Sequence, residues 1–120
     1  MKILVCGGRE SNQQMCNQVW CTLDDHLTAA NNAGQKMVII TGGATGADSY
    51  ANDWAYANDV PCKVFRADWK KHGRAAGPIR NKQMIVEGKP DLVLAFPGGK
   101  GTANMVKQAQ EHGIEVEVTT

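Results

Sequence analysis

Residues 37–48 read MVIITGGATGAD and combine a buried strand, a glycine turn and the beginning of a helix. The apolar, β-branched run Met37–Thr41 is typical of a strand inside a parallel sheet, where both faces are covered. After Gly42 and Gly43, a helix is predicted from Gly46 to Asn58, because apolar residues recur there on one face. Those residues are Ala47, Ala51, Trp54 and Ala55. The stretch therefore predicts one strand-turn-helix unit of an α/β fold.

The same unit recurs along the chain. Further short apolar runs predict strands at Lys2–Cys6, Cys62–Arg66, Asp91–Phe96 and Ile114–Val118. Three more helices are predicted between the strands: from a capping box of Ser11 and Gln14 to Gly34, from Pro78 at the first position to Gly88, and from Gly101 to His112. The alternation predicts an α/β fold, a Rossmann-like three-layer sandwich with a mainly parallel five-stranded sheet.

Length and composition limit the class of protein. A chain of 120 residues with 42% hydrophobic and 21% charged residues is expected to form one globular domain over residues 1–120. The net charge of +1 is too balanced for a surface built wholly to bind nucleic acid or anionic lipid. Because no apolar run approaches the roughly 18 residues of a membrane span, and none at the N-terminus suits a signal peptide, we expect a cytoplasmic protein without membrane contact.

Motifs for metals and common cofactors are missing from the sequence. The four cysteines form no C-x-x-C pair, and His26, His72 and His112 are too scattered to suggest a metal site. The stretch Gly42–Asp48 has no lysine and is therefore not a P-loop, and no G-x-G-x-x-G fingerprint for NAD is present. We expect neither a metal nor a bound cofactor.

Glycine clusters provide the main functional signal. Eight of the 13 glycines fall in three groups: Gly7 and Gly8; Gly42, Gly43 and Gly46; and Gly98, Gly99 and Gly101. Each group follows a predicted strand, so all three should lie at the carboxyl edge of the sheet, where open α/β folds bind ligands. Glycine turns bring backbone N–H groups close to a ligand, and helix N-termini favour anions. The pattern predicts a phosphorylated small molecule, whereas the alternative is that the glycines only form tight turns.

Three further features have two interpretations each. The stretch Lys70–Lys82 contains five basic and no acidic residues, so it is either a solvated surface or a docking site for an anion, with a flexible loop at 75–78 able to close over it. Trp69 either stacks on a base or packs in the core. Asp48 either caps the predicted helix or accepts hydrogen bonds from a ribose.

Five motifs in this order resemble a known family. They are Gly7-Gly8-Arg9, the stretch Gly42–Asp48, Asp68-Trp69, Ala76-Gly77-Pro78-Ile79-Arg80-Asn81, and Pro97-Gly98-Gly99-Lys100-Gly101-Thr102. Over residues 2–118 the chain resembles the small SLOG proteins of the YspA-related type, whose superfamily includes the lonely-guy phosphoribohydrolases and DNA-processing protein A. The resemblance implies a Rossmann-like domain that binds nucleotides or nucleotide-derived ligands, assembles as a homo-oligomer and is linked to phage conflict.

The resemblance leaves enzymatic activity open. Arg80 resembles the active-site Arg of the phosphoribohydrolases, but their glutamate, three residues after the Gly-Thr pair, corresponds to Met105 here. A carboxylate would be needed to stabilise the ribosyl centre or to activate water. Glu10, Asp48 or Asp68 would replace it only if the fold brings one of them within hydrogen-bond reach.

Three functions follow from these patterns. The first is a sensor or sequestering module for a nucleotide-derived ligand, the second is a nucleotide hydrolase or phosphoribohydrolase-like enzyme with Arg80 and Asp48 as catalytic residues, and the third is a nucleic-acid-binding protein, which the near-neutral charge disfavours. The predicted ligand-binding residues are Gly7, Gly8, Arg9, Gly42, Gly43, Gly46, Asp48, Arg80, Asn81, Pro97, Gly98, Gly99, Lys100, Gly101 and Thr102.

Overall fold

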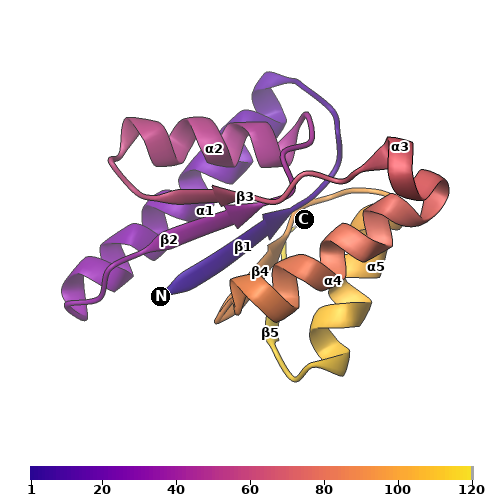
Figure 1. The fold of residues 1–120 in the computed structure, drawn as a ribbon. Coiled ribbons are helices and arrows are strands. Elements are labelled where there is room, and N and C mark those ends of the chain that lie inside the picture. Colours follow the sequence, from indigo (N-terminus) through magenta and orange to yellow (C-terminus); the bar gives the residue numbers. More distant parts are fainter. Residues whose placement is uncertain (120) are drawn as a thin grey trace.

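Five parallel strands form the central sheet of the computed structural model, which describes residues 1–119 (Figure 1). The strands are β1 (Lys2–Cys6), β2 (Val38–Thr41), β3 (Cys62–Val64), β4 (Leu92–Ala95) and β5 (Glu115–Val118). Their order in the sheet is β3-β2-β1-β4-β5, with Ile3 paired to Ile39 on one side and to Leu92 on the other. Every pair of neighbours is parallel, so all carboxyl ends lie at one edge.

Helices cover both faces of this sheet (Figure 1). One face carries α1 (Gln13–Asn32) and α2 (Ala47–Ala57), and the other carries α4 (Ala76–Gly88) and α5 (Lys100–Glu111). A short helix α3 (Trp69–His72) and a 3-10 turn η1 (Gly73–Ala75) connect β3 to α4. The predicted Rossmann-like three-layer sandwich with five parallel strands is confirmed.

Two buried clusters hold the layers together, one on each side of the sheet. The alternation of strand side chains sends Ile3 and Val5 toward α1 and α2, and Leu4 toward α4 and α5. The largest side chain of the first cluster is Trp54, which is fully buried and whose indole N–H donates to Asp24 of α1. Because side chains on both faces of β1 are buried in these clusters, the strand is fixed in place and so is the start of the loop that follows it.

The structure corrects several predicted boundaries. Asn12, not Ser11, is the N-cap of α1, because its side-chain oxygen accepts the N–H of Met15. Pro78 is the third residue of α4 rather than the first, and the predicted flexible loop at 75–78 is helical, spanning the end of η1 and the first turn of α4. β3 ends at Val64, two residues before the predicted Arg66.

In the part of the chain that the structure describes, no helix is long and apolar enough to cross a membrane.

Candidate functional site

The loops after β1, β2 and β4 meet at the carboxyl edge of the sheet. The chain crosses in one direction from β1 to β3 and then returns to β4 on the other side of β1, so the strand order reverses between β1 and β4. Such a reversal opens a crevice in α/β folds. The amide of Gly8 donates to the carbonyl of Pro97 (2.7 Å), and the amide of Ala47 donates to the carbonyl of Gly8 (3.1 Å). The β1 loop is thus tied to both neighbouring loops.

Gly98 and Gly46 show why this close approach requires glycine. A Cβ on Gly98 would lie 2.7 Å from the backbone nitrogen of Gly8 and would also collide with the hydroxyl of Thr102. Gly46 has a φ of 79°, and a Cβ there would collide with the carbonyl oxygen of Gly8. At both positions the missing side chain lets one loop pack directly against the backbone of the next. These two glycines therefore have a structural role in the loops.

A cavity of about 270 Å³ lies at this junction. Most of the predicted ligand residues line it: Gly7, Gly8, Arg9, Asp48, Arg80, Asn81, Gly99, Lys100, Gly101 and Thr102. We refer to it as the first cavity. Its apolar lining comes from Val5, Cys6, Ala44 and Met84. Ala44 lies within the motif Gly42–Asp48, whereas the other three are buried core residues, which carry no local functional signal in the sequence.

The other predicted residues lie around the first cavity rather than in it. Gly42 and Gly43 line an adjoining second cavity of about 320 Å³. Pro97 and Gly98 line an open, mainly apolar groove beside α5 and the end of β5. The predicted set therefore divides between two neighbouring cavities, one groove and the turn at Gly46.

Asp48 organises the loop after β2. Its Oδ2 accepts the amides of Gly42 (3.1 Å) and Ala44 (3.2 Å), and no side-chain bond caps α2 at Gly46, so the predicted capping role is wrong. Burial raises the pKa of the Asp48 carboxyl from 3.8 to about 6, although both amides and the nearby charges of Arg80 and Arg9 act in the opposite direction. The carboxyl group thus titrates near neutral pH in a cavity that contains cations.

Arg80 and Asn81 project from the second turn of α4. The Nη1 of Arg80 donates to the carbonyl of Gly42 (2.7 Å) and its Nε donates to the side-chain oxygen of Asn81 (3.2 Å). Asn81 in turn donates to the carbonyl of Gly101 (3.2 Å) and to the side chain of Asn104. Burial lowers the pKa of Arg80, and Asp48 partly offsets this effect. These bonds fix α4 against the loop after β2 and against the start of α5.

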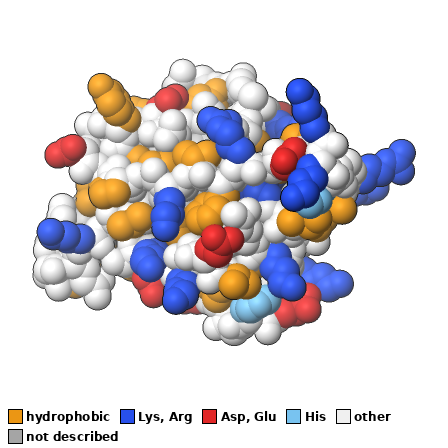
Figure 2. All heavy atoms as spheres, in the orientation of Figure 1, with side chains coloured by type: hydrophobic (Ala, Val, Ile, Leu, Met, Phe, Trp, Pro, Cys, Tyr) orange, Lys and Arg blue, Asp and Glu red, His pale blue; other side chains and the backbone are white. Residues whose placement is uncertain are grey.

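Arg9 and Lys100 add positive charge at the rim of the first cavity. The guanidinium of Arg9 lies 5.9 Å from the centre of the Trp69 ring, a cation-π contact that joins the β1 loop to α3. Trp69 is 50% exposed and lies outside the core, which excludes the packing interpretation. The rest of the basic stretch lies farther out: Lys70, Lys71 and Arg74 are exposed, and Figure 2 shows Lys and Arg side chains gathered on the α3 side of the molecule.

Of the three carboxylates considered as replacements for the family glutamate, only Asp48 lines the first cavity. Asp68 accepts the amide of Lys71 and caps α3, and Glu10 is exposed and contacts the side chain of Asn12. Met105, at the glutamate position, is fully buried in the core cluster of α4 and α5. Burial raises the pKa of the Cys6 thiol to about 12, which disfavours the thiolate form that a nucleophile needs.

Within residues 1–119, no three His, Cys, Asp or Glu side chains come together as metal ligands would. The histidines lie apart: His26 contacts Glu117, and His112 contacts the carbonyl of Gln108 at the end of α5.

Comparison with known proteins identifies the family. The YspA, cpYpsA-related SLOG family matches residues 1–72. The chain is also similar to the gene 61 protein of Mycobacterium phage D29, with 36% identity over 96% of this chain and 93% of that protein. The chain belongs to the YspA, cpYpsA-related SLOG family. The predicted resemblance is therefore confirmed, and the SLOG chain is a nucleotide-related Rossmann-like module.

Two solved structures share the fold of this SLOG protein. DNA processing protein A (DprA) from Streptococcus pneumoniae superimposes with a TM-score of 0.76 at 18% identity, over 98% of this chain and 49% of that chain. The structural-genomics target TM1055 superimposes with a TM-score of 0.68 at 15% identity, over 96% of this chain and 71% of that chain. The SLOG chain thus spans about half the length of DprA.

Proposed function

We propose that this SLOG protein binds a nucleotide or nucleotide-derived phosphorylated ligand in the first cavity and acts as a sensor or sequestering module. One observation carries the proposal: Arg9, Arg80 and Lys100 converge on a glycine-lined cavity. Within residues 1–119, none of these cations has a carboxylate within ion-pair distance. A phosphate site needs cations that have no carboxylate partner and backbone amides that are free to donate, and this cavity combines the two.

The N-terminus of α5 supplies the donors for the phosphate. The helix begins at Lys100 after Gly99, and its first amides have no partner inside the helix. A Cβ on Gly99 would meet nothing within 4 Å, so the backbone there is open to a ligand. Arg80 would neutralise the phosphate. The Oδ1 of Asp48 accepts no bond from residues 1–119 and is the acceptor that suits a ribose hydroxyl.

The test combines binding with product analysis. The purified protein is incubated with nucleoside monophosphates, ADP-ribose and cyclic dinucleotides, and both the bound fraction and the supernatant are analysed by mass spectrometry. A ligand recovered unchanged from wild type supports the sensor. Arg80→Ala is expected to weaken its binding by about 1.5–3 kcal/mol, through loss of a charge-assisted bond. Exposed Arg74 lines neither cavity, so Arg74→Ala is the matched control.

A second function is favoured by the Asp48 carboxyl. A group whose pKa lies at about 6 beside Arg80 is suited to transfer a proton to or from a bound nucleotide, which would make the protein a nucleotide hydrolase. Free base, ribose phosphate or inorganic phosphate in the supernatant, lost in Asp48→Asn, would establish this enzyme and overturn the sensor.

The remaining predictions concern partners. We propose a small ligand rather than a nucleic acid, because Arg9, Arg80 and Lys100 converge on one glycine-lined cavity while the net charge of the whole chain is only +1. The phage relative supports a protein of phage origin or one concerned with phage. The homo-oligomer and the cytoplasmic location stay predictions.

A further inference from the structure

The second cavity adjoins the first and shares three of its lining residues, Arg9, Ala44 and Arg80. The side chains of Arg66 and Trp69 complete its wall. Arg9 and Arg80 therefore face both cavities, whereas Lys100 lines only the first and Arg66 only the second. The site therefore has two groups of cations that share Arg9 and Arg80. The first group also contains Lys100, and the second also contains Arg66.

The arginines of the second cavity have donors to spare. The Nη1 of Arg66 donates to the carbonyl of Gly43 (3.3 Å), and the Nη1 of Arg80 donates to the carbonyl of Gly42. Each guanidinium carries several more N–H groups, which point out from its edges in fixed directions. Within residues 1–119, no carboxylate lies within ion-pair distance of Arg9, Arg66 or Arg80. The second cavity thus has the chemistry of an anion site in its own right.

A phosphate in the first cavity leaves part of the second group of cations unused. A phosphoryl group at the N-terminus of α5 would contact cations of the first cavity and leave the remaining N–H groups of Arg66 without an acceptor, because Arg66 does not line that cavity. A second phosphoryl group on the same ligand would take the free donors of Arg66, and Arg9 and Arg80 would lie between the two.

We propose that the ligand of this protein is a nucleotide with two phosphoryl groups, one in each cavity. This inference rests on the function proposed above and narrows its ligand class. Two sources share the chemistry. In a nucleoside 5′-diphosphate the groups are adjacent, and in a nucleoside 3′,5′-bisphosphate or a cyclic dinucleotide they are separated by ribose.

Isothermal titration calorimetry at one fixed, low salt concentration tests the inference. The probes are the 5′-monophosphates of adenosine, guanosine, cytidine and uridine, their 5′-diphosphates and 3′,5′-bisphosphates, and cyclic di-AMP and cyclic di-GMP. At least one probe with two phosphoryl groups is expected to bind at least about tenfold more tightly than the corresponding monophosphate, as one additional charge-assisted contact would provide. The class of probe that shows this advantage, either the 5′-diphosphates or the bisphosphates and cyclic dinucleotides, identifies the spacing of phosphoryl groups that the site accepts.

Variants at Arg66 assign the advantage to the second cavity. Arg66→Ala is expected to remove the tenfold preference, because the affinity for the probe with two phosphoryl groups should fall to that for the monophosphate. Arg66→Gln keeps an uncharged N–H donor on a shorter side chain, so it tests the loss of the charge with less change in volume and should behave like Arg66→Ala. Arg74→Ala should change neither affinity.

The outcomes separate this inference from the proposed function. Equal affinity for monophosphates and all probes with two phosphoryl groups would overturn the inference and leave the phosphate site of the first cavity intact. Equal weakening of both classes by Arg66→Gln would also overturn it. If no probe binds, the proposed function and the inference both fail.

Discussion

Asp48 shows how one residue can join the structure of a loop to the chemistry of a site. Its Oδ2 holds the amides of Gly42 and Ala44, which fixes the loop between the two cavities. Burial nevertheless disfavours the carboxylate more than these bonds and the arginines favour it, so the pKa rises to about 6. An anion bound nearby would favour the protonated form further, which couples ligand and proton binding at this residue.

Replacing Asp48 by asparagine should therefore change stability in a pH-dependent way. The folded-state pKa of about 6 exceeds the ordinary 3.8, so the stabilising contribution of the protonated carboxyl is present below pH 3.8 and lost as the pH rises through 6. The amide side chain of the variant stays neutral, and its oxygen can accept both backbone amides. We expect Asp48→Asn to match wild type near pH 4 and to exceed it by up to about 3 kcal/mol near pH 8. Urea unfolding at both values measures this, and a pH-independent difference would contradict it.

The position of some other residues in the site could be predicted from the sequence, and that of others could not. Gly99, Lys100 and Thr102 were predictable because they follow a strand and open a helix, and parallel strands end at one edge. Arg66 was not singled out, because it follows β3 without a glycine or a motif, and only the fold brings it to Gly43. Met84 is a core residue of α4, and its apolar side chain carries no chemical signal in the sequence.

At the scale of the element, two neighbouring glycines before α5 have different roles. Gly98 packs against the β1 loop, whereas Gly99 faces open space. Gly98→Ala would force a methyl group against the nitrogen of Gly8, 2.7 Å away, and is expected to cost about 1–3 kcal/mol. Gly99→Val meets open space and has a φ of −101°, so its thermal midpoint should stay within about 4 °C of wild type. Its side chain would nonetheless obstruct the first cavity and abolish nucleotide binding. Circular dichroism and calorimetry separate the two effects; unchanged binding by Gly99→Val would refute the phosphate position.

The cap of α1 provides a second test of an element. The sequence pattern favours Ser11, because Gln14 follows it three residues later, but the side chain that accepts the N–H of Met15 belongs to Asn12. Loss of this bond should destabilise the protein by about 1 kcal/mol in Asn12→Ala, and Ser11→Ala should have no measurable effect. Thermal unfolding of the two variants distinguishes them, and the reverse order would show that the helix begins one residue earlier.

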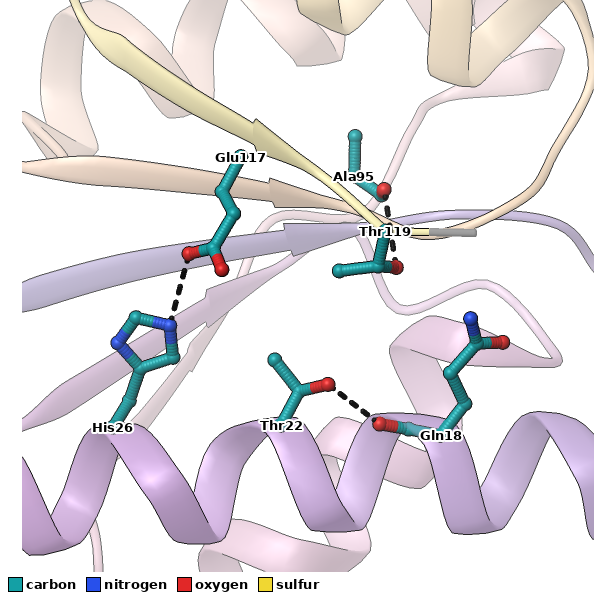
Figure 3. A network of polar contacts seen from close by, with 6 residues as sticks. All are labelled: Gln18, Thr22, His26, Ala95, Glu117 and Thr119. Atoms are coloured by element: carbon teal, nitrogen blue, oxygen red, sulfur yellow. Dashed lines mark hydrogen bonds and ion pairs between the residues drawn. The ribbon is translucent and has the colours of Figure 1, made fainter.

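The polar contacts between α1 and β5 explain another limit of sequence patterns. Gln18, Thr22 and His26 recur along one side of α1, and His26 reaches Glu117 of the edge strand at 3.0 Å (Figure 3). The hydroxyl of Thr22 donates to the carbonyl of Gln18 one turn earlier in α1, and the hydroxyl of Thr119 donates to the carbonyl of Ala95. Helical periodicity identifies a polar face, but it does not say that an edge strand lies opposite.

At the scale of the whole molecule, the two core clusters decide what the site contains. Strand alternation and helix periodicity were sufficient to predict three layers, because each face of the sheet needs an apolar cover. They do not show which residues of α5 face the core and which face the cavity. Met105 lies in the same cluster as Cys6 and Met84, which line the first cavity, yet Met105 itself is fully buried. The position of the family glutamate thus belongs to the core in this protein.

Met105→Glu tests this assignment. A carboxylate placed among Leu4, Cys6 and Met84 would lack a partner, so we expect a loss of at least about 3 kcal/mol and a fall of more than about 10 °C in the thermal midpoint near neutral pH. Because burial would raise the pKa of the new carboxyl, the loss should shrink toward about pH 4, where the group is neutral. Met105→Leu, which conserves volume, should cost less than about 1.5 kcal/mol. A Met105→Glu protein as stable as wild type near neutral pH, with new nucleotide hydrolysis, would instead mean that position 105 opens into the first cavity.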